Sequence, residues 1–166
     1  MPGKEYSLRM ITDLEAMQAA LAEARFAAEA GEVPIGAIIA HEGAIIARGQ
    51  NSVLRDNDPT AHAEIVALRA AAAALANYRL NGCTLFVTLE PCAMCAGAMI
   101  HARLDRLVFA AADPKAGACG SVLPVLNHPQ LNHQMEIAQG ILAGEAGELL
   151  RSFFRDRRNQ TGLPSR

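Results

Sequence analysis

The sequence lacks any hydrophobic run long enough to cross a membrane. Its longest uninterrupted apolar stretch, residues 70–76, has seven residues, whereas a transmembrane helix needs about 20. Residues 1–5 (MPGKE) also lack the order of a secretory signal, in which positive charge precedes an apolar segment. Both absences argue against a membrane or secreted protein, and we expect a cytoplasmic one.

The chain is also poor in charge and has no linker. Charged residues make up 19% of its 166 residues and apolar residues 51%, a balance that argues against intrinsic disorder. No segment rich in proline, glycine or serine divides the chain, and no internal repeat is visible. A chain of this length can bury a sizeable core. The sequence therefore predicts one domain over residues 1–166.

Cysteine is scarce, with only four residues, at positions 83, 92, 95 and 119. Disulfides are rare in the reducing cytoplasm. We therefore expect these cysteines to be free thiols or metal ligands.

The net charge of −2 is small but unevenly distributed. Residues 151–166 hold five arginines against one acid, which gives +4, while the other 150 residues hold ten bases against sixteen acids, which gives −6. A basic terminal segment on an acidic body suits contact with a polyanion. Arginines near a helix C-terminus also complement the helix dipole. On charge alone, a solvated helix end is the favoured interpretation.

Hydrophobic periodicity and turn residues predict a mixture of helices and short strands. Thr12 and Glu15 form a capping-box pattern, and Gly43 lies in a hairpin loop at 41–43. We expect helices over residues 13–30, 60–76, 92–102 and 141–158, and strands over residues 35–40, 44–49, 83–88, 106–110 and 135–139. This order predicts an α/β fold with three layers, α/β/α, around a central mixed sheet of about five strands.

Residues 89–95 (LEPCAMC) carry the most specific chemical signal. Pro91 suits the first turn of a helix, where its missing N–H costs little. Cys92 and Cys95 are three residues apart and share one helix face, so both sulfurs can bind one ion. A helix N-terminus also favours the thiolate form of cysteine. The segment therefore predicts two metal ligands at a helix start.

Residues 60–64 (TAHAE) lie at a second predicted helix start and supply further groups. His62 is the best candidate for a third ligand, and Glu64 can stand beside the fourth position because both side chains lie at the helix end. Three protein ligands and one open position are typical of a catalytic zinc site. We expect one Zn²⁺ per subunit with a bound water or hydroxide.

Other sites could use the same cysteine pair. Cys-x-x-Cys at a helix start is also the motif of thioredoxin-like redox proteins, but a redox pair needs no His-x-Glu segment. A structural zinc site would recruit Cys83 and Cys119, although Cys83 opens an apolar strand and Cys119 lies in a glycine-rich loop. The catalytic zinc site is the favoured interpretation. No partner at ligand spacing accompanies the other histidines, at 41, 101, 128 and 133.

The two segments together predict a hydrolytic deaminase. Zinc lowers the pKa of a bound water to about 7, so that hydroxide is available at neutral pH. Glu64 would take the proton of the water and pass it to the substrate as a general acid. Attack on an amidine-like ring carbon then releases ammonia. His-x-Glu followed by Pro-Cys-x-x-Cys is the signature of zinc-dependent nucleobase deaminases.

Seven stretches match one family over nearly the whole chain. They are GEVPIGAIIA (31–40), GQN (49–51), DPTAHAEIVALR (58–69), NYRL (77–80), TLFVTLEPCAMCAGAMIHAR (84–103), LNH (131–133) and SFFRDRR (152–158). In these the sequence resembles the bacterial tRNA-specific adenosine deaminases, within the cytidine/deoxycytidylate deaminase-like superfamily. The resemblance implies a cytidine deaminase-like fold and conversion of adenosine to inosine at the wobble position, position 34, of tRNA-Arg.

The resemblance also implies roles for individual residues. His62, Cys92 and Cys95 would bind zinc, and Glu64 would shuttle protons. Residues that match substrate-contacting positions of the family are Val33, Asn51, Ala63, Asp113, Lys115, His128, Asn132, Phe154 and Arg155. Among them, Asn51 would hydrogen-bond the target nucleoside, and residues 113 and 115 would hold the backbone and ribose of the anticodon loop.

Two partners are implied, the anticodon stem-loop of tRNA-Arg and a second copy of the chain. The small-residue helix 93–102, with Gly97, could form the seam of a homodimer or could pack within one chain. In the C-terminal helix, the i,i+4 pair of Leu149 and Phe153 predicts that Phe153 lies in the core. The arginines at 151, 155 and 158 share one face and are the better candidates for RNA contact.

Two rival functions stay open at the level of the residues. A free-base or nucleoside deaminase acting on guanine or cytosine would have the same zinc site. A zinc-stabilised RNA-binding module without catalysis would also hold the metal, but it would have no use for Glu64 beside an open position. The basic terminus and Asn51 favour the RNA substrate.

Overall fold

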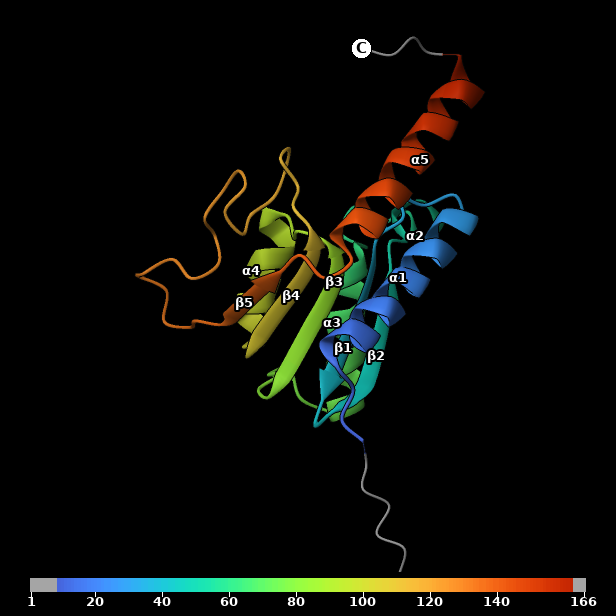
Figure 1. Cartoon of the computed structure of the whole chain (residues 1–166). Helices are drawn as coiled ribbons and strands as arrows, with labels where there is room; N and C mark the ends of the chain where they lie inside the picture. Colours follow the sequence, from blue (N-terminus) through green and yellow to red (C-terminus); the bar gives the residue numbers. More distant parts are fainter. Residues whose placement is uncertain (1–8, 163–166) are drawn as a thin grey trace, which may run out of the picture.

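The computed structural model describes residues 9–162, which form a five-stranded sheet between two layers of helices (Figure 1). The helices are α1 (Asp13–Glu29), α2 (Val53–Asp56), α3 (Ala63–Leu75), α4 (Ala93–Ala102) and α5 (Ala143–Thr161), and the strands are β1 (Gly36–His41), β2 (Ala44–Gln50), β3 (Cys83–Leu89), β4 (Arg106–Ala111) and β5 (Glu136–Gln139). The strand order is β2-β1-β3-β4-β5. β1 is antiparallel to β2 and β3, whereas β3, β4 and β5 run parallel.

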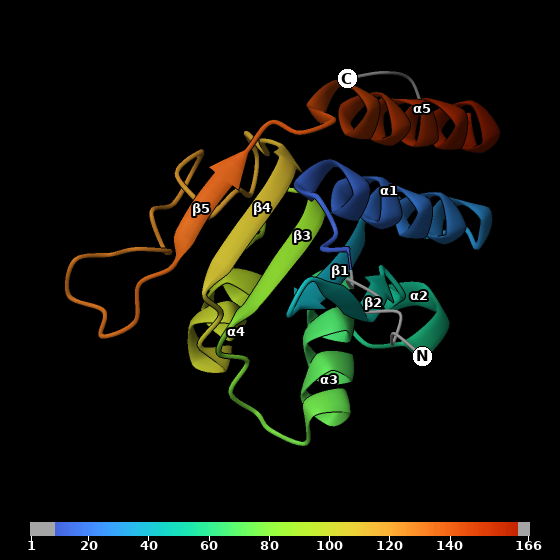
Figure 2. The ribbon, with the colours of Figure 1, turned by 60° about the horizontal axis from the view of Figure 1, so that its bottom comes forward.

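Helices α1 and α5 lie on one face of the sheet, and α3 and α4 lie on the other (Figure 2). Side chains along β3 alternate between the two faces, as the pleat of a strand requires. Phe86 packs with the α1 side, while Leu85 and Val87 pack with the α3 and α4 side. This arrangement confirms the predicted α/β/α architecture and brings the N-termini of α3 and α4 into the same layer.

The local signals at the start of the chain form as predicted. Thr12 Oγ1 accepts a hydrogen bond from the backbone N–H of Glu15 at 3.2 Å, and the Glu15 carboxylate accepts one from the N–H of Thr12 at 2.9 Å. The hairpin between β1 and β2 turns through Glu42 and Gly43, with φ values of 50° and 77°. Positive φ at both central residues is the geometry of a type I′ turn, which favours glycine at the second position.

Both helices that carry the predicted ligands begin later than the sequence suggests. α3 starts at Ala63 and not near residue 60, because the Asp58 carboxylate accepts hydrogen bonds from the N–H and hydroxyl of Thr60, at 2.8 and 2.7 Å, and holds a turn before the helix. The expectation that Pro91 lies in the first helical turn is wrong. Pro91 precedes the N-cap residue Cys92, so the chain stays extended at the cysteine.

The segment between the strand expected over 44–49 and the helix expected over 60–76 contains the four-residue helix α2. Ser52 Oγ donates to the Asp56 carboxylate at 2.8 Å, and the N–H of Arg55 donates to Glu32 at 2.8 Å. These contacts come from side chains, so the polar composition alone does not show this helix. The turn holds residue 51 against the body of the protein.

The C-terminal helix runs over Ala143–Thr161, slightly later than the expected 141–158. Phe153 is only half-buried, so the prediction that it lies in the core is wrong. Ala146 is the one fully buried residue of α5. The second half of the helix extends beyond the sheet (Figure 1), where there is no core to cover it.

Within residues 9–162, none of the helices combines the length and the apolar character needed to span a membrane. Residues 1–5, where the sequence shows no secretory pattern, and Arg166 of the basic segment lie outside the described residues.

Candidate active site

His62 and Cys92 occupy equivalent positions, each directly before a helix. His62 is the N-cap residue of α3 and Cys92 is that of α4, and both have extended backbones, with ψ of 153° and 174°. Neither side chain caps its own helix. Cys95 follows in the first turn of α4. The three side chains are therefore free to face one another, as the motif spacing predicts.

The ligand atoms of these three residues converge. His62 Nδ1 lies 3.6 Å from Cys92 Sγ and 3.5 Å from Cys95 Sγ, and all three atoms lie within 4.8 Å of one another. A tetrahedral ion with Zn–S of about 2.3 Å and Zn–N of about 2.1 Å holds sulfur and nitrogen about 3.6 Å apart. The donor set therefore fits zinc. Within residues 9–162, no fourth histidine, cysteine or acid joins the group.

We call His62, Cys92 and Cys95 the metal triad. Its two cysteine side chains differ in protonation. Hydrogen bonds from Cys95 and His62 lower the pKa of Cys92 to about 3, so Cys92 is a thiolate at neutral pH. The pKa of Cys95 is raised because its thiol donates to Cys92 and is buried. A metal ion has to displace the proton of Cys95 to gain its second sulfur ligand, so binding releases protons.

Glu64 lies beside the metal triad without belonging to it. Its side chain is buried, and this burial raises its pKa to about 7, while the nearby charge of His62 opposes the rise. A carboxyl group with a pKa near neutrality can both accept and donate a proton. The arrangement therefore combines three ligands with an uncoordinated acid, which suits metal-assisted hydrolysis.

A structural site made from all four cysteines is excluded by the fold. Cys83 opens β3, at the other end of the strand from Cys92, and seven strand residues span about 23 Å. It is buried, and this burial raises its pKa to about 11. Cys119 lies outside the converging group, and burial raises its pKa to about 12. Cys83 is therefore a buried thiol at the start of an apolar strand.

Asn51 is held close to the start of α3. The N–H of the next residue, Ser52, donates to the carbonyl of Ala61 at 3.0 Å, and the N–H of Asn51 donates to the carbonyl of Ile35 at 3.1 Å. The Asn51 amide donates to a Glu32 carboxylate oxygen at 3.4 Å, and both side chains are buried. Ser52 follows Asn51 and Ala61 precedes His62, so this backbone hydrogen bond holds the predicted substrate residue close to the ligand His62.

Comparison with known proteins agrees with this geometry. The MafB19-like deaminase family matches residues 11–158. The tRNA-specific adenosine deaminase of Aquifex aeolicus is 46% identical over 157 residues, which cover 95% of this chain and 97% of that protein. The chain belongs to this deaminase family, in its tRNA-specific adenosine deaminase branch.

Solved structures confirm the fold of this deaminase. A tRNA:A34 deaminase, from a study of A-to-I editing at the wobble position, superposes with a TM-score of 0.79 at 46% identity, covering 81% of this chain and 98% of that one. A guanine deaminase from Nitrosomonas europaea superposes with a TM-score of 0.76 at 28% identity, covering 87% and 86%. The sequence of this chain is thus more similar to the tRNA:A34 deaminase than to the guanine deaminase.

Two further predicted substrate residues of the deaminase lie near Asn51 and the metal triad. Ala63 is the first residue of α3, directly after His62, and is fully buried. Val33 is partly exposed, and its carbonyl accepts a hydrogen bond from the N–H of Ile35 at 2.8 Å. Ile35 in turn binds the backbone of Asn51. Their contacts with substrate stay predictions.

The loop that carries Asp113 and Lys115 is fixed to the start of α4. Glu90, two residues before Cys92, accepts a hydrogen bond from the N–H of Asp113 at 2.9 Å. Burial raises the pKa of Glu90, but hydrogen bonds from Ser121, Asp113 and the N–H of residue 119 outweigh it and hold the pKa below its ordinary value. Lys115 is exposed beside this anchor.

The remaining predicted contacts lie on more distant elements. Asn132 Oδ1 accepts a hydrogen bond at 3.0 Å from Arg103, which caps the opposite end of α4 from Cys92. His128 is exposed in the long segment between β4 and β5. On α5, Phe154 is 42% exposed, and Arg155 is exposed as well. Within a single chain, Asn132 therefore lies at the end of α4 that is remote from the metal triad.

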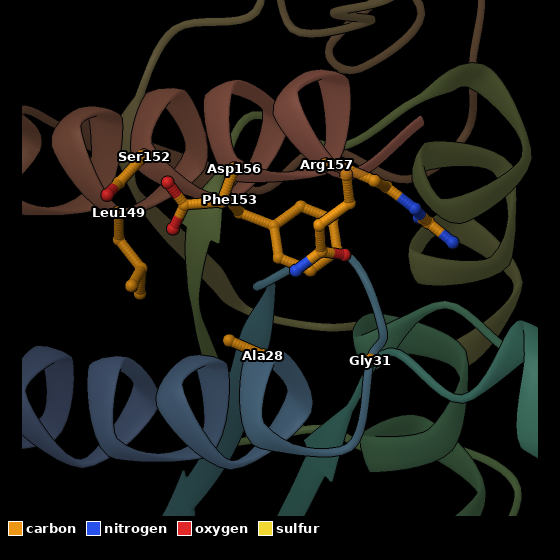
Figure 3. Close-up of a pocket in the computed structure, with 8 residues that line it drawn as sticks. Ala28, Gly31, Leu149, Ser152, Phe153, Asp156 and Arg157 are labelled. Atoms are coloured by element: carbon orange, nitrogen blue, oxygen red, sulfur yellow. The ribbon is translucent and has the colours of Figure 1, made fainter. Parts of the chain in front are cut away.

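A groove of about 420 Å³ separates the end of α1 from α5 (Figure 3). The ring of Phe153 points from α5 into this space, toward the turn at Gly31. Gly31 directly precedes Glu32 and Val33, so the groove lies next to the predicted substrate residue Val33. Its lining comprises Ala28, Gly31, Leu149, Ser152, Phe153, Asp156, Arg157 and Gln160.

Proposed function

We propose that this protein is a zinc-dependent hydrolase that converts adenosine 34 of tRNA-Arg to inosine and ammonia. The observation that carries the proposal is the convergence of His62, Cys92 and Cys95 beside a buried, uncoordinated Glu64. Membership of the tRNA-specific adenosine deaminase branch supports the choice of substrate.

Each residue of the site has a distinct task in this reaction. The metal triad would hold one zinc ion, which would supply a water activated at neutral pH. Glu64 accepts a proton at its carboxylate and returns it to the substrate, so that the exocyclic amino group leaves as ammonia. The burial of Glu64 keeps bulk water from competing for that proton. Water is consumed and no other reactant is needed.

The substrate residues form two groups around the metal triad. Asn51, Val33 and Ala63 would contact the target nucleoside, and Asp113 and Lys115 would hold the adjoining RNA backbone. Contacts further along the anticodon loop would come from His128, Asn132, Phe154 and Arg155. An anticodon loop is single-stranded, so displacing one base from its stack costs less there than in a duplex.

A homodimer and a cytoplasmic location belong to the same proposal. The surface that supports a dimer seam is on α4, where Met94 is 37% exposed and a Cβ added at Gly97 would meet nothing within 4 Å. Sedimentation at micromolar concentration is expected to show a species of twice the chain mass. A species of one chain mass alone would remove the dimer.

The substrate is tested by incubating the metal-loaded protein with transcribed tRNA-Arg and, separately, with free adenosine, cytidine and guanine. We expect inosine and ammonia from the tRNA, and none from a matched transcript with guanosine at position 34. Turnover of a free base or nucleoside without turnover of the tRNA would overturn the proposal. Turnover of guanine alone would favour the guanine deaminase activity of the N. europaea protein, whose fold this chain shares.

A further inference from the structure

Glu90 is a buried carboxylate whose partners all come from one loop. Glu90 is 3% exposed. One oxygen accepts hydrogen bonds from the N–H of Asp113 at 2.9 Å and from the hydroxyl of Ser121 at 2.5 Å. The other accepts from the N–H groups of Cys119 at 3.0 Å and Ser121 at 3.1 Å. Among the described residues, no cation pairs with Glu90, so the carboxylate serves this loop.

The backbone around Glu90 is shaped to receive the same loop. The N–H of Ala118 donates to the carbonyl of Pro91 at 2.8 Å. A Cβ added at Gly117 would lie 2.4 Å from a Glu90 carboxylate oxygen and 2.6 Å from the carbonyl of Asp113. Only a glycine therefore leaves room for the carboxylate. The loop over residues 113–121 is wrapped around one side chain.

This loop carries the residues that the proposed function assigns to RNA. Asp113 Oδ1 accepts from the N–H of Lys115 at 2.9 Å, so the turn that displays Lys115 depends on where Asp113 lies. Glu90 accepts a hydrogen bond from the N–H of Asp113. The metal ligand Cys92 follows Glu90 by two residues. A single short segment therefore sets both the metal position and the loop position.

We propose that Glu90 is a positioning residue for RNA binding. It holds Asp113 and Lys115 at a fixed place relative to the metal triad, so that the ribose-phosphate backbone beside the target adenosine is gripped while the base reaches the reaction centre. This inference rests on the proposed function, because it takes the RNA contact of the loop from there.

The choice of a carboxylate has a specific consequence for Glu90→Gln. A carboxylate accepts at both oxygens, whereas glutamine has one acceptor oxygen and one N–H₂ group. The position that faces the N–H groups of Cys119 and Ser121 needs an acceptor. The N–H₂ group must therefore face the Ser121 hydroxyl, which can accept, and the N–H of Asp113, which cannot. Glu90→Gln releases the Asp113 end of the loop and keeps the other end.

The test compares steady-state kinetics on an anticodon stem-loop RNA for the wild type, Glu90→Gln, Gly117→Ala and the double variant. We expect KM to rise about tenfold in Glu90→Gln, with kcat within about twofold, because an N–H is left without its partner. Gly117→Ala displaces the same carboxylate, so the double variant is expected to be little worse than either single one. Gly144→Ala is the control, since its Cβ meets nothing within 4 Å.

Two further measurements separate the possible outcomes. Elemental analysis is expected to find one zinc per chain in every variant, and hydrogen exchange at Asp113 is expected to quicken in Glu90→Gln. Loss of zinc and of kcat at unchanged KM would show that Glu90 serves only the metal helix and would overturn the inference. Equal KM in wild type and Glu90→Gln would also overturn it. Failure of the wild type to deaminate the RNA would instead remove the proposed function. If Glu90→Gln does not fold, Gly117→Ala decides.

Discussion

The side-chain amide of Asn51 donates a hydrogen bond to the buried carboxylate of Glu32. The second oxygen of Glu32 accepts from the backbone N–H of Arg55 at 2.8 Å, and the Arg55 guanidinium lies 3.9 Å away. A carboxylate has no hydrogen to donate, so Asn51 Nδ2 faces Glu32 and Asn51 Oδ1 faces away from it. Glu32 therefore determines which amide atom of Asn51 is available for the proposed contact with the nucleoside.

Substitution Glu32→Gln removes that constraint, since glutamine can accept from Asn51 or donate to it. We expect KM for the RNA substrate to rise several-fold with a smaller change in kcat, and unfolding to need about 1–3 kcal/mol less free energy. Kinetics and denaturant unfolding measure the two effects. Glu29→Gln, at an exposed position three residues earlier in the chain, is the matched control. An unchanged KM in Glu32→Gln would contradict the orienting role.

Gly49, in the GQN stretch, allows β2 to lie directly against α3. A Cβ at this position would come within 2.2 Å of the Ala63 carbonyl and 2.7 Å of the Ala67 nitrogen, both of which are backbone atoms. Gly49→Ala must therefore shift α3, which begins after the ligand His62. We expect a stability loss of about 1–3 kcal/mol and reduced zinc content, measured by thermal unfolding and elemental analysis. Full zinc content in a destabilised Gly49→Ala would show that α3 moves without disturbing the ligand.

Glu148 pairs with two arginines of α5 that are candidates for RNA contact. Its carboxylate lies 3.1 Å from the Arg151 guanidinium and 3.6 Å from that of Arg155. Glu148→Gln frees both cations, so we expect tighter tRNA binding, whereas Arg155→Gln is expected to weaken it and to reduce the slope of log affinity against log salt by about one. Salt titrations of tRNA affinity measure both. If neither variant changes affinity, the arginines belong to a solvated helix end.

The metal triad could be predicted because its signals are local. Each ligand belongs to a short motif at a predicted helix start, so residue types and local spacing identify the three ligands in the sequence. The fold then brings His62 to the two cysteines, which lie 30 and 33 positions away along the chain. Glu32 and Glu90 give no such signal. Their hydrogen-bond partners lie 19 to 31 positions away along the chain, and only the folded sheet brings them together.

Phe153 shows a second limit of sequence patterns. Its i,i+4 spacing with Leu149 is the same whether a helix covers a sheet or extends past its edge. In the structure α5 extends beyond the edge of the sheet (Figure 1), and Phe153 lines the groove between α5 and Gly31. Helix periodicity does not show how far the sheet extends beneath a helix. Burial near a helix end is therefore not predictable from periodicity.

Asp13 and Arg106 tie α1 to the sheet through a pH-dependent pair. Two hydrogen bonds join them, at 2.6 and 2.7 Å, and these bonds from Arg106 hold the pKa of Asp13 below its ordinary value. A carboxyl group with a lowered pKa in the folded state stabilises the fold above its unfolded pKa of about 3.9, and this stabilisation is lost as pH falls through the folded pKa. Asp13→Asn is therefore expected to be less stable than the wild type at pH 6, with the difference closing below about pH 4. Denaturant unfolding across this range measures it, and a constant difference would show that the pair contributes no charge-dependent stability.

Glu64 decides between a catalyst and a zinc-stabilised RNA-binding module. In Glu64→Ala and Glu64→Gln, no side chain remains to accept and return the proton, so we expect ammonia release to fall at least about a hundredfold. Zinc content and tRNA affinity are expected to stay at the wild-type level, because the three ligand atoms converge without the Glu64 carboxylate. Cys92→Ala is the contrasting variant, since it removes a ligand and is expected to lose both zinc and activity. Loss of zinc in Glu64→Gln would make Glu64 a ligand, and retained ammonia release would assign the proton transfer to another group.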